Sequence, residues 1–327
     1  MTHLFFSWPS VGQSLVALLM LFASCQEPAT TASLPEVVVQ LPAEETLDYF
    51  TSETDTLRAD LYRCGAPDRP LLIYIHGGGF YSGARNEPHL QEFCRALSQK
   101  NYNVASIDYS LFLKGEKFDC DQPVLRKLEA LKHASTDILQ AASFFIEQQN
   151  VLGITTDKII LLGSSAGAEA ACWVCFSDEK CVEGVEIPLP KNFKFSGLVS
   201  MAGAVTDTLL MTKANALPTL LFHGTCDPLV PYGHAIHHYC EPTDVGALDL
   251  YGSFPIYQRS KQVGMTCRLV TGCGLGHVMA ALPLTEHFDH VVNFIQEEVE
   301  RKLSDSFHLI IPGDEPCSEY PIHCSDF

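Results

Sequence analysis

Residues 163–167 read Gly-Ser-Ser-Ala-Gly, a pattern whose central serine, Ser165, can act as a nucleophile in acyl transfer. The mostly apolar run at residues 158–162 predicts a strand before this pattern, and the alanine-rich stretch after it predicts a helix. A sharp turn between the two would expose the Ser165 hydroxyl, and the flanking glycines would relieve the crowding of the backbone there. The sequence therefore predicts a nucleophile at Ser165.

A glycine-rich stretch offers a second part of such a site. Residues 71–75 form an apolar run of strand length, and residues 76–80 after it read His-Gly-Gly-Gly-Phe. Ordering three consecutive glycines costs conformational entropy, but it lets main-chain N–H groups face a ligand without side chains in the way. In acyl transfer that ligand is the oxyanion that develops on the carbonyl oxygen.

An acid and a base complete the set. Asp227 follows a predicted strand at residues 217–222, and His277 lies in a glycine-rich loop after a predicted strand at residues 266–271. Each is a common loop residue on its own, but both follow strands, and the order Ser165, Asp227, His277 is that of the α/β-hydrolase triad. The sequence therefore predicts Ser165 as nucleophile, His277 as base and Asp227 as the group that orients His277.

The chain resembles the α/β-hydrolases of the esterase and lipase type over residues 45–304, and it is most similar to bacterial carboxylesterases and polysaccharide-ester esterases. The matching motifs are H-G-G-G-F at 76–80, G-x-S-x-G at 163–167, H-G-x-x-D-P-x-V-P at 223–231 and G-x-G-H at 274–277. The resemblance implies an α/β-hydrolase fold with a mainly parallel central sheet flanked by helices. The sequence shows no large cap domain, and acyl transfer by a serine triad needs no cofactor or metal. The resemblance also implies an oxyanion hole made by the backbone N–H groups of Gly78, Gly79 and Ala166.

One segment departs from these relatives. Many of them carry Asp-Tyr-Arg or Asn-Tyr-Arg after the strand that follows the glycine loop, whereas this chain reads Asp108-Tyr109-Ser110. An interaction that depends on that arginine is therefore not expected from these three residues.

The remaining elements alternate between strands and helices, which favours a mainly parallel sheet with right-handed connections. A hairpin is predicted within residues 46–62, and a last helix at about 285–303. Residues 177–195 and 240–255 have the composition of insertions, and each either borders the pocket or forms a plain surface loop. The other predicted elements are strands at 104–108 and 197–202 and helices at 88–100 and 122–149.

Composition limits the possible partners. The 327 residues are 46% hydrophobic and 18% charged, which fits one globular domain with a sizeable core. The net charge is −18, from 39 acidic and 21 basic residues, and no basic run occurs. Because binding to phosphates needs clustered Lys and Arg, we expect no nucleic-acid partner and no attraction to an anionic membrane surface.

The first residues resemble a targeting segment. A short apolar run at residues 15–24 ends in Ala-Ser before Cys25, as in bacterial lipoprotein signals whose cysteine is lipidated. Cleavage at an ordinary secretory site and an uncleaved anchor stay open as alternatives, and all three predict export. The predicted organisation is a signal segment at 1–25, a tether at 26–44, a catalytic domain at 45–304 and a tail at 305–327. The expected location is the periplasm, the cell surface as a lipoprotein, or the medium.

Cysteines and histidines leave further alternatives open. Besides Cys25 there are twelve cysteines, an even number that fits export, but buried thiols and disulfides are both compatible with their positions. Cys317 and Cys324 could join in the tail. The histidines at 234, 237 and 238, with Cys240, have a spacing that a metal could use on a helix face, but a helix end near the surface is the simpler interpretation.

Three functions from different classes fit these observations. The first is a carboxylic-ester hydrolase acting on an ester substrate, with acetyl or hydroxycinnamoyl groups on glycans as candidates. The second is a serine peptidase on the same scaffold, although such enzymes usually carry a large extra domain. The third is a non-catalytic binding module, against which the presence of all three triad residues argues.

Overall fold

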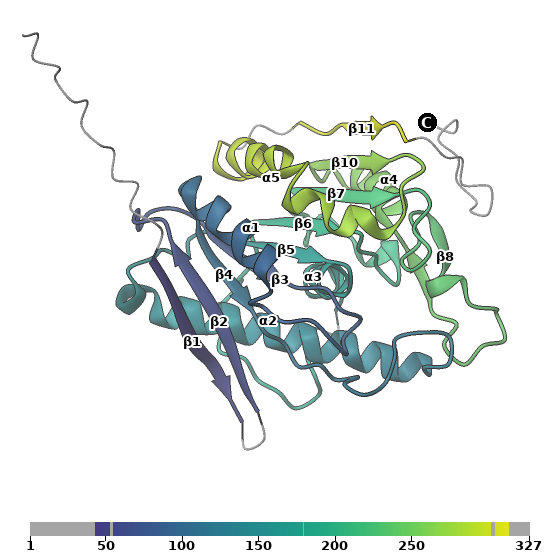
Figure 1. The fold of residues 1–327 in the computed structure, drawn as a ribbon, viewed down its shortest axis with the longest axis horizontal. Helices are drawn as coiled ribbons and strands as arrows, with labels where there is room; N and C mark the ends of the chain where they lie inside the picture. The colour runs from purple at the N-terminus through teal and green to yellow at the C-terminus, as the bar shows by residue number, and fades with distance from the viewer. Residues whose placement is uncertain (1–42, 53–54, 179, 302–304, 314–327) are drawn as a thin grey trace, which may run out of the picture. The chain divides into compact units, whose positions relative to one another are not determined.

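The computed structural model describes residues 43–52, 55–178, 180–301 and 305–313. Within them, one large sheet consists of β1 (Ala43–Thr51), β2 (Thr56–Arg63), β3 (Leu71–Ile75), β4 (Asn103–Ile107), β5 (Ile159–Ser164), β6 (Gly197–Met201), β7 (Thr219–Gly224), β10 (Cys267–Gly272) and β11 (His308–Ile311). Their order across the sheet is β1-β2-β4-β3-β5-β6-β7-β10-β11 (Figure 1). The β1–β2 and β2–β4 pairs are antiparallel, and all pairs from β4 to β11 are parallel.

Helices cover both faces of this sheet. On β5, Ile159 and Leu161 join one apolar cluster, whereas Ile160 and Leu162 join another, as the alternation of side chains along a strand requires. The first cluster includes side chains of α2 (Val124–Leu152), α3 (Ala166–Phe176) and α4 (Ser253–Val263), and the second includes side chains of α1 (Pro88–Gln99) and α5 (Phe288–Phe294). Strands covered on both sides are continuously apolar, which explains the runs that the sequence shows at β3 and β5.

The parallel strands bring the candidate site together. The loops after β3, β5, β7 and β10 all leave the carboxyl edge of the sheet, where open α/β sheets bind their ligands. The predicted hairpin is confirmed as the antiparallel pair β1 and β2, and the predicted fold class is confirmed as well.

Two predicted boundaries are wrong. The segment taken as a tail from residue 305 contributes β11, which pairs in parallel with β10 and extends the sheet; its four residues are too few to show a pattern in the sequence. The last helix begins at Phe288 rather than at 285, because Thr285 has φ −132° and ψ −81° and ends the short turn η4 (Leu282–Leu284). After α5 the chain continues as η5 (Ile295–Glu300), with i to i+5 hydrogen bonding.

A small two-stranded sheet lies beyond β7. It pairs β8 (His234–Ile236) with β9 (Asp249–Tyr251), where the sequence indicated a helix around residues 234–238 and an insertion at 240–255. Strands of three residues give no periodic signal, so sequence patterns could not predict them. The remaining short turns are η1 (Thr208–Leu210), η2 (His237–Tyr239) and η3 (His277–Ala280).

The described cysteines include both disulfide-bonded residues and free thiols, the two states that the sequence left open. Cys120 and Cys240 form a disulfide across 120 residues, and Cys226 and Cys273 are disulfide-bonded as well. Cys317 and Cys324 lie outside the described residues. The free thiols of the described part are Cys64, Cys94, Cys172, Cys175, Cys181 and Cys267.

Removing the Cys120–Cys240 disulfide should destabilise the protein. A cross-link over such a long loop restricts the unfolded chain strongly, so Cys120→Ser/Cys240→Ser should lower the free energy of unfolding by about 2–5 kcal/mol. Thermal unfolding under non-reducing conditions measures the change. Cys181→Ser, at a half-buried free thiol, is the control and should leave the melting temperature in place. Equal melting temperatures for the double variant and the native protein would contradict the expectation.

The predicted signal segment and tether at 1–44 lie almost entirely outside the described residues. Among the helices that the structure does describe, none combines the length and the apolar character that crossing a bilayer requires.

Candidate active site

Ser165 lies at the turn between β5 and α3, where the sequence predicts a sharp turn. Its backbone has φ 53° and ψ −124°, a conformation that residues with a Cβ rarely adopt, and its N–H donates to the carbonyl of Met201 at 2.8 Å. A Cβ at Gly163 would lie 2.4 Å from the carbonyl oxygen of Gly167, and one at Gly167 would lie 2.3 Å from that of Ile75. The two glycines are therefore required for the close approach of backbones at this turn.

The structure brings the three predicted side chains together. Nε2 of His277 lies 2.8 Å from Oγ of Ser165, and its Nδ1 lies 2.7 Å from Oδ2 of Asp227. Asp227 follows β7 and His277 opens η3 after β10, so residues separated by 112 and 50 positions along the chain form one hydrogen-bonded line. His277 is partly exposed and Asp227 is buried, which leaves the serine end of the line open to a substrate.

Four groups surround the buried carboxylate of Asp227. Its Oδ1 accepts the backbone N–H groups of Leu229 at 2.9 Å and Val230 at 3.0 Å, and Nε2 of His223 lies 3.4 Å from Oδ2. Burial raises the pKa of Asp227, but hydrogen bonds and electrostatic attraction between its carboxylate and the side chains of His223 and His277 outweigh burial and hold this pKa below its usual range.

The ionised Asp227 fixes the tautomer of His277. A carboxylate only accepts hydrogen bonds, so Nδ1 of His277 must carry the proton that it donates to Oδ2. Nε2 is then unprotonated and can accept the hydroxyl proton of Ser165. The arrangement can therefore deprotonate Ser165 as its oxygen attacks an electrophile.

The glycine loop and the start of α3 supply the predicted N–H donors. Gly78, Gly79 and Ala166 line the same cavity as Ser165 and His277, which has a volume of about 470 Å³. Within the described residues, none of these three N–H groups donates to a protein acceptor. They are therefore free to donate to the oxyanion of a substrate, which is the role that the resemblance implies for them.

Gly78→Ala should weaken this set of donors. Gly78 has φ +119°, and a Cβ there would lie 2.1 Å from the carbonyl oxygen of Ser82, so the loop has to move. Displacing one oxyanion donor lowers kcat by about 10²–10³-fold. Gly115→Ala is the matched control, because Gly115 also has a positive φ but has no atom within 4 Å of the added Cβ. If both variants retain the same kcat on a chromogenic ester, the glycine loop holds no oxyanion.

Asp108 is paired with an arginine, although Ser110 stands where many of the similar proteins carry one. Nη1 of Arg85 lies 2.6 Å from Oδ2 of Asp108, and Nε of Arg85 lies 3.1 Å from Oδ1 of the buried Asp60. The hydroxyl of Tyr109 donates to the carbonyl of His76 at 3.1 Å, next to the glycine loop. Asp108 is therefore paired, with an arginine from the loop before α1.

The histidine cluster does not form a helix face. His234 lies in β8, His237 and His238 lie in η2, and His238 has φ 58°. The sulfur of Cys240 is bonded to Cys120, so it is no free thiolate ligand. Both the metal-site interpretation and the helix-end interpretation assumed a helix at these residues, but the structure has a strand and a tight turn there.

Within the described residues, neither predicted insertion contributes a residue to the lining of the cavity of Ser165. His237 and His238, just before residues 240–255, line it, and Cys240 joins the opposite loop. Residues 177–195 instead line a separate cavity of about 410 Å³ that includes Cys175 of α3.

Sequence reasoning missed Glu169. It lies one turn after Ser165 on α3, is 4% exposed, and lines the cavity. The signal was present in the sequence, because Glu169 is the single charged residue of the helix Ala166–Phe176. Burial, followed by the charge of Asp227, raises the pKa of Glu169 to about 8, while Lys127 acts in the opposite direction.

This raised pKa predicts a pH-dependent stability. An unperturbed glutamate has a pKa of 4.5, so between about pH 4.5 and 8 Glu169 holds a proton in the folded protein that it loses on unfolding. Its contribution to stability is therefore lost as pH rises through this window. The difference in melting temperature between Glu169→Gln and the native protein should grow in favour of the variant from pH 5 to pH 8. A difference that stays constant over this range would contradict the assigned pKa.

Comparisons with known proteins support the class that fold and site indicate. The BD-FAE family model matches residues 60–216, which include the glycine loop and Ser165. Lipase 2 of Moraxella sp. (strain TA144) is 32% identical over 108 residues, 33% of this chain and 21% of that protein. Hormone-sensitive lipase of Bos taurus is 28% identical over 154 residues, 46% of this chain and 18% of that protein. The chain thus spans about a fifth of the length of these curated relatives.

Two esterases are among the solved structures with the same fold. The propionate-bound esterase Est2 of Thermogutta terrifontis has a TM-score of 0.55 and 17% identity, covering 78% of this chain and 96% of that chain. The esterase Est22 has a TM-score of 0.51 and 15% identity, covering 79% of this chain and 81% of that chain. The chain therefore has the α/β-hydrolase fold, and its predicted resemblance to esterases and lipases is confirmed.

Proposed function

We propose that this protein is a serine hydrolase that cleaves carboxylic esters through an acyl-enzyme intermediate. The observation that carries the proposal is the line from Asp227 through His277 to Ser165, with separations of 2.7 and 2.8 Å. These are hydrogen-bond distances, and they give the serine a base and the base an orienting carboxylate.

In the proposed reaction each of these groups has a role. Oγ of Ser165 attacks the ester carbonyl while Nε2 of His277 takes its proton, and Asp227 stabilises the imidazolium. The N–H groups of Gly78, Gly79 and Ala166 hold the oxyanion. His277 then protonates the leaving alkoxide, and a water molecule, deprotonated by the same imidazole, releases the acid from Ser165.

The names of the similar proteins agree with this reaction. They are lipases and esterases, and the esterase of Thermogutta terrifontis has been solved with propionate bound and phosphoramylated by tabun. Organophosphorus reagents of this kind modify activated serines, so the same reactivity is expected of Ser165.

For the natural substrate we propose an ester borne by a glycan, with an acetyl or hydroxycinnamoyl group. This follows from the resemblance to polysaccharide-ester esterases and from the predicted export, with Cys25 as a site of lipid attachment. The matching BD-FAE family model and the open cavity of about 470 Å³ beside Ser165 are consistent with it.

A substrate panel tests the proposal. The purified protein should hydrolyse p-nitrophenyl acetate or butyrate, and release acids from acetylated xylan or feruloylated arabinoxylan. An aminoacyl p-nitroanilide serves as the amide control and should be cleaved far more slowly. Cleavage of the amide without cleavage of any ester would favour a peptidase, and no turnover of either kind would overturn the proposal.

A further inference from the structure

The cavity beside Ser165 has a polar end that the proposed reaction does not use. Glu169 of α3 and His237 of η2 form it, and both line the cavity although they are 4% and 1% exposed. Oε1 of Glu169 lies 3.7 Å from Nε2 of His237, which is too long for a hydrogen bond. Within the described residues, the carboxyl of Glu169 has no hydrogen-bond partner, and neither has Nδ1 of His237.

Both groups are uncharged near neutral pH. Burial raises the pKa of Glu169 to about 8, so its carboxyl is mostly protonated and can donate as well as accept. Burial, with the nearby charges of His238 and Lys127, lowers the pKa of His237 well below its usual range, so this imidazole is neutral. The polar end therefore offers hydrogen bonds without a net charge of its own.

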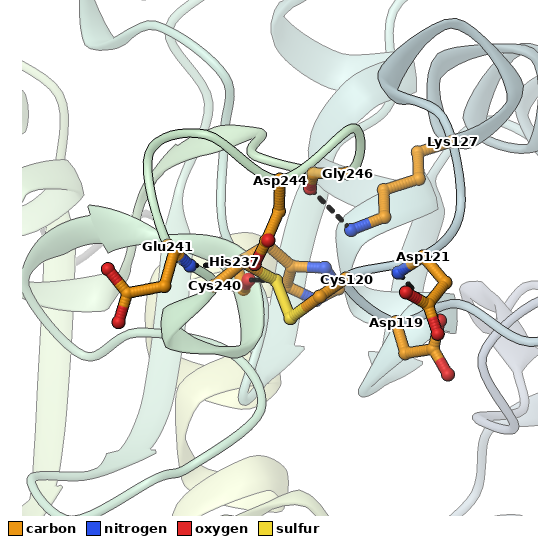
Figure 2. Close-up of a disulfide and its surroundings, with 9 residues drawn as sticks. All are labelled: Asp119, Cys120, Asp121, Lys127, His237, Cys240, Glu241, Asp244 and Gly246. Atoms are coloured by element: carbon orange, nitrogen blue, oxygen red, sulfur yellow. Dashed lines mark hydrogen bonds between the residues drawn. A yellow bond between two sulfur atoms is a disulfide. The ribbon is translucent and has the colours of Figure 1, made fainter.

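The surrounding structure holds this end in place. The disulfide joins Cys120 to Cys240 and fastens the loop of His237 onto the loop before α2 (Figure 2). The buried Nζ of Lys127 donates to the carbonyl of Gly246 at 2.7 Å, on the same loop as Cys240 (Figure 2). The ring of Phe118 packs edge-on against the ring of His237, with 4.8 Å between centroids. The positions of the polar atoms are thus set before a substrate enters.

A hydroxyl group fits this end better than an apolar or a charged group. Buried donors and acceptors that stay unpaired are costly, and an apolar group would exclude water from them without replacing its hydrogen bonds. A carboxylate would lose its hydration and would lie near the buried carboxylate of Asp227. A hydroxyl is neutral and can both donate and accept.

We propose that Glu169 and His237 form a recognition site for an uncharged hydroxyl group on the ester substrate. The inference rests on the proposed ester hydrolysis and adds a selection among esters. Esters that place a hydroxyl at this end of the cavity are bound productively, and their methyl analogues leave both buried groups unpaired.

Matched ester pairs test the site. Hydroxyethyl butyrate and propyl butyrate differ by hydroxyl against methyl on the alcohol side. The methyl esters of para-hydroxyphenylpropanoate and para-methylphenylpropanoate differ in the same way on the acyl side. In the native protein the hydroxyl member of at least one pair should have a kcat/KM about tenfold or more above its methyl twin. A third ester, in which a carboxylate replaces the hydroxyl, should have the lowest kcat/KM of the three.

Variants locate the preference. Glu169→Leu and His237→Phe should each bring the kcat/KM ratio of the hydroxyl ester to its methyl analogue towards one. Glu169→Gln keeps a donor and an acceptor, so it should retain most of the preference for the hydroxyl ester. Glu147→Leu, at an exposed position of α2, is the matched control and should leave the ratio unchanged. Circular dichroism checks that each variant is folded.

Two kinds of failure can be told apart. If the native protein hydrolyses esters but both ratios are near one, or if Glu169→Leu and His237→Phe leave a preference intact, the recognition site is overturned while the proposed function stands. If no ester is hydrolysed and Ser165 does not react with a fluorophosphonate probe, the proposed function itself fails.

Discussion

Ser165→Ala should reduce kcat on p-nitrophenyl butyrate by about 10⁴–10⁶-fold, because it removes the oxygen that forms the acyl-enzyme. The hydroxyl makes one contact of consequence, 2.8 Å to Nε2 of His277. Its loss leaves the turn intact, since alanine is no larger than serine, and the unusual φ of 53° is set by the backbone around it. Stopped assays with high enzyme concentrations measure the residual rate.

A second serine provides the control for this variant. Ser98 of α1 is 2% exposed, belongs to the opposite face of the sheet from α3, and its Oγ has no partner among the described residues. Ser98→Ala should therefore keep kcat at the native value. If Ser165→Ala retained activity within tenfold of the native protein, another nucleophile would have to be sought.

Asp227→Asn should lower kcat by about 10⁴-fold, and the surroundings of the carboxylate explain why. Oδ1 accepts two backbone N–H groups, from Leu229 and Val230, so the amide oxygen of asparagine must take that place. The amide NH₂ then occupies the place of Oδ2 and donates to Nδ1 of His277. The imidazole proton moves to Nε2, which can no longer accept the proton of Ser165.

The same substitution at a surface aspartate separates this effect from a general loss of charge. Asp249 lies 3.4 Å from His234, and its side chain is 68% exposed. Asp249→Asn should leave kcat unchanged. Fluorophosphonate labelling of Asp227→Asn should be slowed in parallel with turnover, and a variant that labels and turns over at the native rate would show that Asp227 does not orient His277.

The sequence predicted the parts of the fold with strong periodic patterns. Long apolar runs such as those of β3 and β5 are continuous because helices cover both faces of the sheet, and such runs are visible without a structure. Strands of three or four residues, such as β8, β9 and β11, lack this signal. Their pairing depends on residues far away in the chain, so the structure was needed to find them.

The candidate site divides in the same way. Ser165, Asp227 and His277 were predicted because motif and order mark them, and the structure places them within hydrogen-bond distance of one another. Glu169 and His237 have no motif, and they meet only because the fold and the Cys120–Cys240 disulfide bring α3 and η2 to one cavity. The pairing of cysteines cannot be deduced from one sequence. The position of His237 in the cavity depends on such a pairing, so it could not be predicted either.

Trapping the acyl-enzyme tests the central claim most directly. The protein is mixed with p-nitrophenyl butyrate, quenched in acid within the first turnovers, and digested for mass spectrometry. We expect a butyryl group on the peptide that contains Ser165, and none on that peptide from Ser165→Ala. Turnover of the ester with the acyl group on another residue, or with Ser165 unmodified throughout, would contradict the claim.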